Sequence, residues 1–174
     1  MNKIAIYVIV AIYALYWSTE SIAKGVYLEP EVFIAQTFDN NPPKPDKLWI
    51  TKKLKTAIYN ILGHDLGVIR LRYWDDKIKR AWILEEIGRD RPITVGLVVK
   101  DKKIEQVNVL IFRESRGWEI KYPFFTDQFK QARLIINNEL DRNIDGISGA
   151  TLSVKALTKL ARLALYLDTQ VSNK

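Results

Sequence analysis

The strongest hydrophobic pattern in the chain is an amphipathic helix signal near its C-terminal end. Apolar residues recur there at helical spacing, at Val154, Leu157, Ala161 and Ala164. Polar and charged residues fall on the opposite face of the same helix, at Lys155, Lys159, Arg162 and Tyr166. Ser153 is a residue type that commonly caps helices, so we expect the helix to begin there and to dock its apolar face on a core.

An earlier stretch also predicts a helix, and its two ends carry typical capping residues. Its apolar residues share one face: Leu54, Ala57, Ile58, Ile61 and Leu62. Thr51 stands where an N-cap is expected, and Gly63 stands where a glycine ends a helix.

Between these two helices the pattern changes to the period of β-strands. Ile69, Leu71 and Tyr73 alternate with polar or aromatic neighbours, and after a turn the apolar run resumes over 81–84, which predicts a hairpin. Residues 93–99 and 104–112 predict a second hairpin around a charged turn. The fold class expected is therefore α+β, with a small antiparallel sheet of about four strands flanked by helices.

The N-terminal stretch predicts an export segment. Its apolar run, 4–17, is shorter than the roughly 20 residues of a comfortable membrane span and matches the apolar region of a secretory signal. Ser21 and Ala23 are small residues placed for cleavage after Ala23. We expect 1–23 to be a signal peptide or an uncleaved signal anchor. The protein would then be exported, to the periplasm or the extracytoplasmic face of the membrane.

Proline-rich sequence separates the export segment from the folded part. Residues 40–45, Asn-Asn-Pro-Pro-Lys-Pro, disfavour helix and cannot sit in a central strand. We therefore expect 24–48 to be a connector and 49–174 to be the folded domain.

The composition restricts the cofactors that the protein can use more than it restricts the cellular compartment in which the protein works. The chain has 174 residues and a formal net charge of +7, with Lys and Arg spread along it, which is typical of a solvated basic surface. No basic run is interleaved with aromatic residues, so nucleic acid is disfavoured as a partner. The absence of cysteine excludes disulfides and thiolate-held iron–sulfur clusters. Redox chemistry would therefore need an organic cofactor.

The chain's single histidine, His64, gives little reason to expect a metal site. No cluster of carboxylates and histidines accompanies it in sequence, whereas a metal site normally needs three or four ligands. At the end of a helix its charge would interact favourably with the helix dipole, so we expect a structural role and no metal site.

A turn of small residues, Ser148-Gly149-Ala150-Thr151, lies just before or at the start of the C-terminal helix. Unpaired N–H groups and the positive end of the helix dipole favour an anion such as phosphate at that place. From physics alone, two interpretations stay open: a phosphate site, or a loop whose polar residues cap the helix.

The same residues resemble a family signature. Asp145, Ser148, Gly149, Ala150 and Thr151 match the Asp-x-x-Ser/Thr-Gly-Ala-Thr motif of the FMN-binding domain family, found in the C subunit of the sodium-pumping NADH:quinone reductase and the G subunit of the Rnf complex. The resemblance implies that FMN is carried on Thr151 through a phosphoester bond. It also implies that the other four residues form the recognition sequence, with Ser148 able to hydrogen-bond the phosphate.

The resemblance continues in the stretch after the second hairpin and covers roughly 93–167. Family members carry a Glu-x-Pro-Gly-like turn followed by a Phe-x-x-Gln-Phe-like helix start, and this chain fits at Glu114, Gly117, Phe125, Gln128 and Phe129. Ser115 and Arg116 replace the usual Thr-Pro. The implied cofactor contacts are Glu114, Gly117 and a stacking aromatic, Trp118 or Phe125, while Arg116 is a candidate partner of the phosphate.

The function implied is that of an exported flavoprotein that passes electrons between other redox proteins. The chain has no Gly-x-Gly pair for binding NAD(P)H, and the flavin chemistry needs no catalytic residue from the protein. Its implied partners are a flavin transferase and a redox protein of the membrane or periplasm; the oligomeric state stays open. Two other classes also stay open: a flavin-dependent reductase of a small substrate or ferric iron, and a flavin-free exported binding module.

Overall fold

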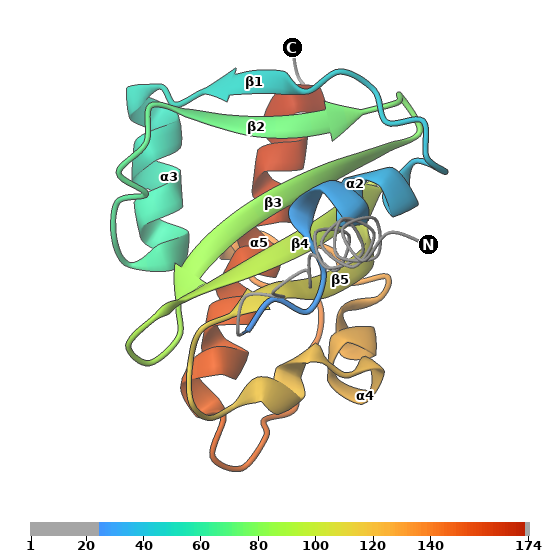
Figure 1. Ribbon diagram of the computed structural model, residues 1–174. Coiled ribbons are helices and arrows are strands. Elements are labelled where there is room, and N and C mark those ends of the chain that lie inside the picture. The colour runs from blue at the N-terminus through green and yellow to red at the C-terminus, as the bar shows by residue number, and fades with distance from the viewer. Residues whose placement is uncertain (1–24, 173–174) are drawn as a thin grey trace, which may run out of the picture.

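The protein forms one antiparallel sheet with helices on both of its faces (Figure 1). The structure is a computed structural model in which residues 25–172 are described, so the predicted export segment lies outside the described residues. The elements follow in the order α2 (Pro30–Thr37), β1 (Asp46–Trp49), α3 (Lys52–Leu62), β2 (Arg70–Asp75), β3 (Lys79–Ile87), β4 (Pro92–Lys100), β5 (Lys103–Phe112), η1 (Trp118–Lys121), α4 (Pro123–Thr126), η2 (Asp127–Phe129), η3 (Ile136–Asn138) and α5 (Thr151–Ser172).

The sheet confirms the predicted α+β class but has one more strand than the pattern indicated. Five strands pair antiparallel in the order β1-β2-β3-β4-β5. The four strands that the alternation predicted are β2 to β5, and the fifth is β1, which pairs with β2. Its four residues bury only Leu48, so no period could reveal it before its partner was known.

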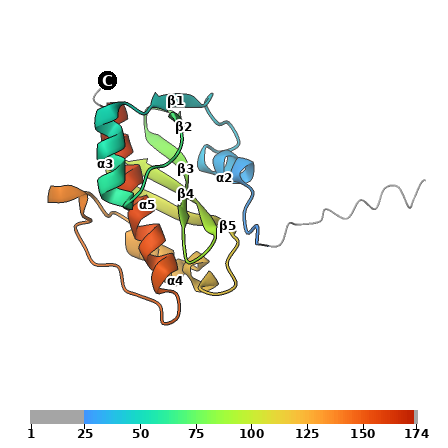
Figure 2. The same cartoon turned by 90° about the vertical axis from the view of Figure 1, so that its left-hand side faces the viewer.

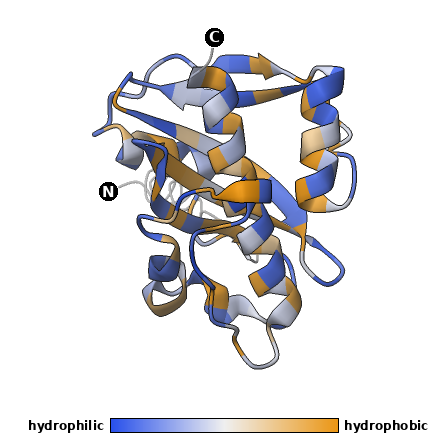
Figure 3. Ribbon diagram, turned by 180° about the vertical axis from the view of Figure 1, so that it is seen from behind, coloured by the Kyte–Doolittle hydropathy of each residue, from blue (hydrophilic) through white to orange (hydrophobic). Residues whose placement is uncertain are grey.

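The helices divide between the two faces of the sheet. In Figure 2, α3 and α5 lie on one side and α2 on the other. The larger core fills the space between the sheet and the pair α3 and α5, with Trp82 and Leu157 fully buried there. Figure 3, viewed from the α3 and α5 side, shows apolar residues along the central strands behind α5.

The stretch predicted as a connector contains α2, which forms a small core on the opposite face of the sheet. That core consists of Phe33, Ile34, Phe38, Ala81, Val98 and Leu110. A Cβ at Gly96 would lie 2.6 Å from the ring of Phe33, so the glycine makes room for this ring against β4. The helix is therefore held by a close approach to the sheet, which its own eight residues do not reveal.

Both caps predicted for α3 are confirmed. The Thr51 hydroxyl accepts a hydrogen bond from the Leu54 N–H at 3.3 Å. Gly63 adopts the left-handed conformation with φ of 86° and donates its N–H to the Tyr59 carbonyl at 2.7 Å. The helix consequently ends beside His64.

Ser153 was wrong as the predicted N-cap, because it places the start of the C-terminal helix three residues too late. α5 begins at Thr151, and its first hydrogen bond runs from the Val154 N–H to the Ala150 carbonyl at 2.9 Å. Ser153 is therefore a buried residue of the first turn and not the N-cap. The predicted apolar face is buried as expected, at Val154, Leu157, Ala161 and Ala164. No helix within 25–172 is long and apolar enough to cross a membrane.

Candidate functional site: a helix N-terminus beside a groove

Thr151 is the first residue of α5, and its side chain is exposed. Ala150 is buried and donates its N–H to the Ile147 carbonyl at 2.9 Å, which closes a turn directly before the helix. Gly149 has φ of 80°, a conformation that favours glycine. The first N–H groups of a helix have no intrahelical acceptor, and the helix dipole is positive there. The Thr151 hydroxyl therefore lies where an anionic group is stabilised.

A groove of about 640 Å³ runs from Thr151 along one side of α5. Along α5 it is lined by Thr151, Val154, Lys155, Thr158, Lys159 and Arg162, and the loop before α5 contributes residues between Glu139 and Gly146. The polar face of α5, predicted simply as the face turned away from the core, thus forms one wall of a groove. Its volume lies within the roughly 300–1,000 Å³ typical of small-molecule sites.

Four cationic side chains line this groove, but most of their charge is already compensated. Arg142, Lys159 and Arg162 lie 3.0, 3.1 and 2.8 Å from carboxylate oxygens of Asp141, Glu86 and Glu139. Lys155 makes no hydrogen bond or ion pair within the described part of the chain. It stands one turn after Thr151 on the same side of the helix. Lys155 is therefore the cation most free to pair with an anion at Thr151.

The loop after β5 packs against the start of α5. Gly117 has φ of 84°, and a Cβ there would lie 2.7 Å from the Ser153 hydroxyl oxygen and 3.3 Å from the Ala150 Cβ. Only a glycine fits both the backbone conformation and this approach. The two stretches that carry the family resemblance, far apart in sequence, are thus brought into contact at Gly117.

Asp145 of the motif is held by η2, whereas Ser148 of the motif and Arg116 of the loop after β5 are exposed. The Asp145 N–H donates to the Gln128 side-chain oxygen at 2.6 Å, which ties the motif loop to η2. Ser148 and Arg116 are both exposed. Arg116 has no hydrogen bond or ion pair among residues 25–172, so its guanidinium is a second free cation in a loop that touches the start of α5.

Glu114 does not line the groove; it binds the turn between β3 and β4. Its Oε1 accepts the backbone N–H groups of Arg89, Asp90 and Arg91 at 2.6, 2.8 and 2.9 Å, and so caps the turn between β3 and β4. Burial alone would raise the pKa of this carboxyl, but the three N–H donors outweigh it and lower the pKa. Glu114 thus acts in the structure as an organiser of the turn.

We expect Glu114→Gln to destabilise the fold by about 1–2 kcal/mol at neutral pH, because three N–H donors lose a charged acceptor. A pKa lowered by folding means that this stabilisation is present above the ordinary carboxyl pKa and is lost as the pH falls through the lowered value. Urea unfolding at neutral and acid pH checks this: the difference from wild type should shrink in acid. Glu105→Gln is the control, since Glu105 has no partner in the described chain; an equal loss in both variants would contradict the prediction.

The two aromatic candidates for stacking differ in accessibility. Trp118 is 41% exposed, with its ring edge-on to Tyr122 at 5.7 Å. Phe125 is fully buried, and its ring packs edge-on against Phe129 at 5.6 Å. Phe125 is therefore a core residue and is not available to stack on a flavin ring, whereas Trp118 is.

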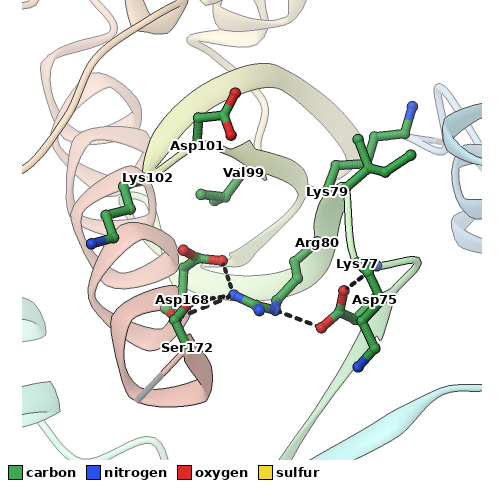
Figure 4. Close-up of a pocket in the computed structure, with 10 residues that line it drawn as sticks. Asp75, Lys77, Lys79, Arg80, Val99, Asp101, Lys102, Asp168 and Ser172 are labelled. Atoms are coloured by element: carbon green, nitrogen blue, oxygen red, sulfur yellow. Dashed lines mark hydrogen bonds and ion pairs between the residues drawn. The ribbon is translucent and has the colours of Figure 1, made fainter. Parts of the chain in front are cut away.

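A different pocket, at the far end of α5, is occupied by ion pairs (Figure 4). Arg80 extends between two carboxylates there, with its Nε 2.8 Å from Asp75 and an Nη 2.7 Å from Asp168. The same Nη donates to the Ser172 hydroxyl at 2.8 Å. The guanidinium is thus satisfied by the protein itself, and this pocket joins the end of α5 to the sheet. Among residues 25–172, no group of three or more His, Asp or Glu could hold a metal ion.

The geometry brings a helix N-terminus, an exposed hydroxyl and a lysine unpaired within residues 25–172 together at a groove of an α+β domain, an arrangement that suits a phosphorylated ligand. Residues 88–166 match the family model described as the FMN-binding domain, which confirms the resemblance seen in the motif. The match supports a flavin-binding protein. It includes β4, β5, Gly117, Thr151 and most of α5. No curated protein and no solved structure matches the chain.

The residues present fit FMN. The exposed Thr151 hydroxyl, the first N–H groups of α5 and the unpaired Lys155 suit its phosphate. The groove adds apolar lining at Leu140, Ile144 and Val154 beside its polar residues, as a ring system with polar edges requires. When bound, FMN accepts and donates electrons, and the protein supplies its position and its electrostatic surroundings.

Proposed function

We propose that this protein is an exported electron carrier in which FMN is linked to Thr151 through a phosphoester bond. One observation carries the proposal: Thr151, the last residue of the motif, exposes its hydroxyl on the first turn of α5 at the mouth of a groove of ligand size. In a folded protein a hydroxyl that accepts a large group must be reachable, and the motif threonine is.

The bond would form by transfer from FAD by a flavin transferase. The Thr151 hydroxyl gives up its proton and its oxygen bonds to the flavin-proximal phosphorus, while the pyrophosphate bond of FAD breaks and AMP leaves. The chain is the substrate of that reaction and provides no catalytic group. After attachment, Lys155 and the first N–H groups of α5 hold the remaining phosphate charge, with Ser148 and Arg116 as further donors from the neighbouring loops.

Electron transfer suits the site better than substrate turnover. No Gly-x-Gly pair is present in the sequence to receive NAD(P)H. Electrons would therefore arrive from one redox protein of the membrane or periplasm and leave to another. A net charge of +7 would favour the approach of an acidic partner. A covalent bond also keeps the flavin from being lost outside the cytoplasm.

The test is to export the full chain together with a flavin transferase and to measure its intact mass after denaturation. We expect added mass of one FMN less one water, and a flavin absorbance that dithionite bleaches and air restores. Protein of unchanged mass from cells with an active transferase would overturn the covalent linkage. The same spectrum reports whether residues 1–23 are retained, which tests the predicted export segment separately.

A further inference from the structure

A buried carboxylate, Glu86, lies between the Thr151 groove and a second opening of the protein. Glu86 belongs to β3, and its side chain is only 3% exposed. An isolated charge buried to this degree is costly unless it is paired. Two side chains face it: the Lys159 ammonium lies 3.1 Å from one carboxylate oxygen, and the His64 Nε2 lies 2.8 Å from the other.

Lys159 and His64 face different spaces. Lys159 lines the groove that begins at Thr151. His64, together with Glu86, lines a separate pocket of about 320 Å³, and its side chain is 44% exposed to solvent. His64, Glu86 and Lys159 therefore form a row of contacting ionisable side chains that runs from solvent, between β3 and α5, to the groove.

The hydrogen bonds of His64 indicate its charge. Its Nδ1 lies 2.9 Å from the Asp65 carbonyl oxygen, which can only accept, and its Nε2 faces the Glu86 carboxylate. Nδ1 therefore donates to the carbonyl, and when the ring is protonated Nε2 donates to the Glu86 carboxylate as well, so the imidazolium form satisfies both contacts. The Asp65 carbonyl raises the pKa of His64, partial burial opposes it, and Glu86 raises the pKa further. Nothing in the sequence indicated that His64 and Glu86 are partners, because 22 residues separate them.

The other charges around His64 are accounted for. Lys55 of α3 pairs with Asp65 at 3.1 Å, and the charged side chains of the described chain that act on the ring are Glu86 of β3 and Lys159 of α5. With a protonated His64 the cluster carries a net charge of +1, and with a neutral His64 it carries none. In the neutral state Glu86 is balanced by Lys159 alone. When His64 is protonated, the negative charge of Glu86 is shared between His64 and Lys159. More of the positive charge of Lys159 is then free to act on the groove.

We propose that His64, acting through Glu86, sets the positive charge that Lys159 presents to the groove, and that FMN held at Thr151 is therefore easier to reduce when His64 is protonated. This inference rests on the proposed FMN site. The electrons come from an external donor, and the proton on His64 comes from solvent at its exposed ring. His64 and Glu86 are positioning residues, since they act on the cofactor only through Lys159. Because coupling between two sites is reciprocal, reduction of the flavin must raise the pKa of His64.

The experiment uses the flavin-loaded full chain, free of any tag, in which His64 is the only histidine. Its ring C–H signal is titrated by NMR in oxidised protein and in dithionite-reduced protein. We expect a higher pKa in the reduced protein, by roughly 0.3 unit or more, which is at least about a twofold gain in proton affinity. A parallel potentiometric titration should show extra pH dependence of the midpoint potential around the His64 pKa, and His64→Gln should remove it.

Variants of the groove lysines separate the proposed route from a general effect of charge. Lys159→Gln should abolish the redox-linked pKa change, and Lys159→Arg should restore it. Lys155→Gln should lower the potential at every pH but leave the change in place, because Lys155 has no link to Glu86 within the described chain. An identical His64 pKa in both redox states, or an undiminished change in Lys159→Gln, would overturn this inference alone. Absence of FMN from Thr151 would overturn the proposed function together with it.

Discussion

Thr151→Ala is expected to remove all covalently bound FMN. The hydroxyl oxygen is the atom that would form the phosphoester, and alanine offers none. The side chain is exposed on the first turn of α5, so its replacement leaves the buried neighbours Ala150 and Ser153 in place. The variant should therefore fold normally and be colourless. Intact-mass spectrometry of the exported protein, with circular dichroism to verify folding, measures both properties.

Two further threonine variants define the specificity of this result. Thr158→Ala is the matched control, because Thr158 lines the same groove and bonds its hydroxyl to the Val154 carbonyl at 2.9 Å. It should keep the full FMN mass. Thr151→Ser keeps a hydroxyl at the same position and should retain at least some attachment. Loss of FMN from Thr158→Ala, or full loading of Thr151→Ala, would place the linkage elsewhere in the groove.

The sequence predicted the parts of the fold that have a long local period. The alternation in 69–73 and the runs 81–84, 93–99 and 104–112 identified β2 to β5, and the helical spacing from Val154 identified the buried face of α5. Each of these elements repeats its pattern often enough to be recognised without its neighbours. The missed element, β1, has four residues and one buried side chain, and it depends on pairing with β2.

The candidate site was predictable where it depends on a contiguous motif. Asp145 to Thr151 precede a helix, and both the anion-binding helix N-terminus and the family resemblance follow from that stretch. The groove was not predictable, because its second wall is a loop whose path depends on long-range contacts such as that of Arg162 with the Asn138 carbonyl at 2.6 Å. Phe125 shows that a motif position can also mislead. The family pattern suggested Phe125 as a stacking residue, but it packs against Phe129 in the core.

The sequence pattern also could not predict the charge clusters that form between residues far apart in the chain. The bond between Lys159 and Glu86 joins positions 73 residues apart, and the bond between Arg80 and Asp168 joins positions 88 apart. In the sequence each of these side chains looks like an ordinary solvated charge. Only the packing of α5 across β3 and α3 makes them partners, and it also buries them enough for the pairing to affect stability.

Arg80→Met is accordingly expected to destabilise the fold strongly, by about 3–5 kcal/mol. The Arg80 side chain is 18% exposed, and its partners Asp75 and Asp168 are 11% and 6% exposed. Methionine would fill much of the same space but would leave two largely buried carboxylates without their cation. In thermal unfolding this corresponds to a drop in Tm of roughly 6–20 °C. Arg89→Met is the control, since its pair with Asp90 is 68% and 72% exposed and should contribute less than about 1 kcal/mol.

The pH dependence of the Arg80→Met defect distinguishes an uncompensated charge from lost packing. Burial raises the pKa of Asp168, and Arg80 opposes that shift, so removing Arg80 should raise the pKa further. A pKa raised by folding favours the folded state at low pH, and that advantage is lost as the pH rises through the raised value. The variant should therefore approach wild-type stability as the pH falls and should be least stable, relative to wild type, at neutral pH. A deficit of equal size at acid and neutral pH would mean that packing of the Arg80 side chain, and not its charge, holds the end of α5 to the sheet.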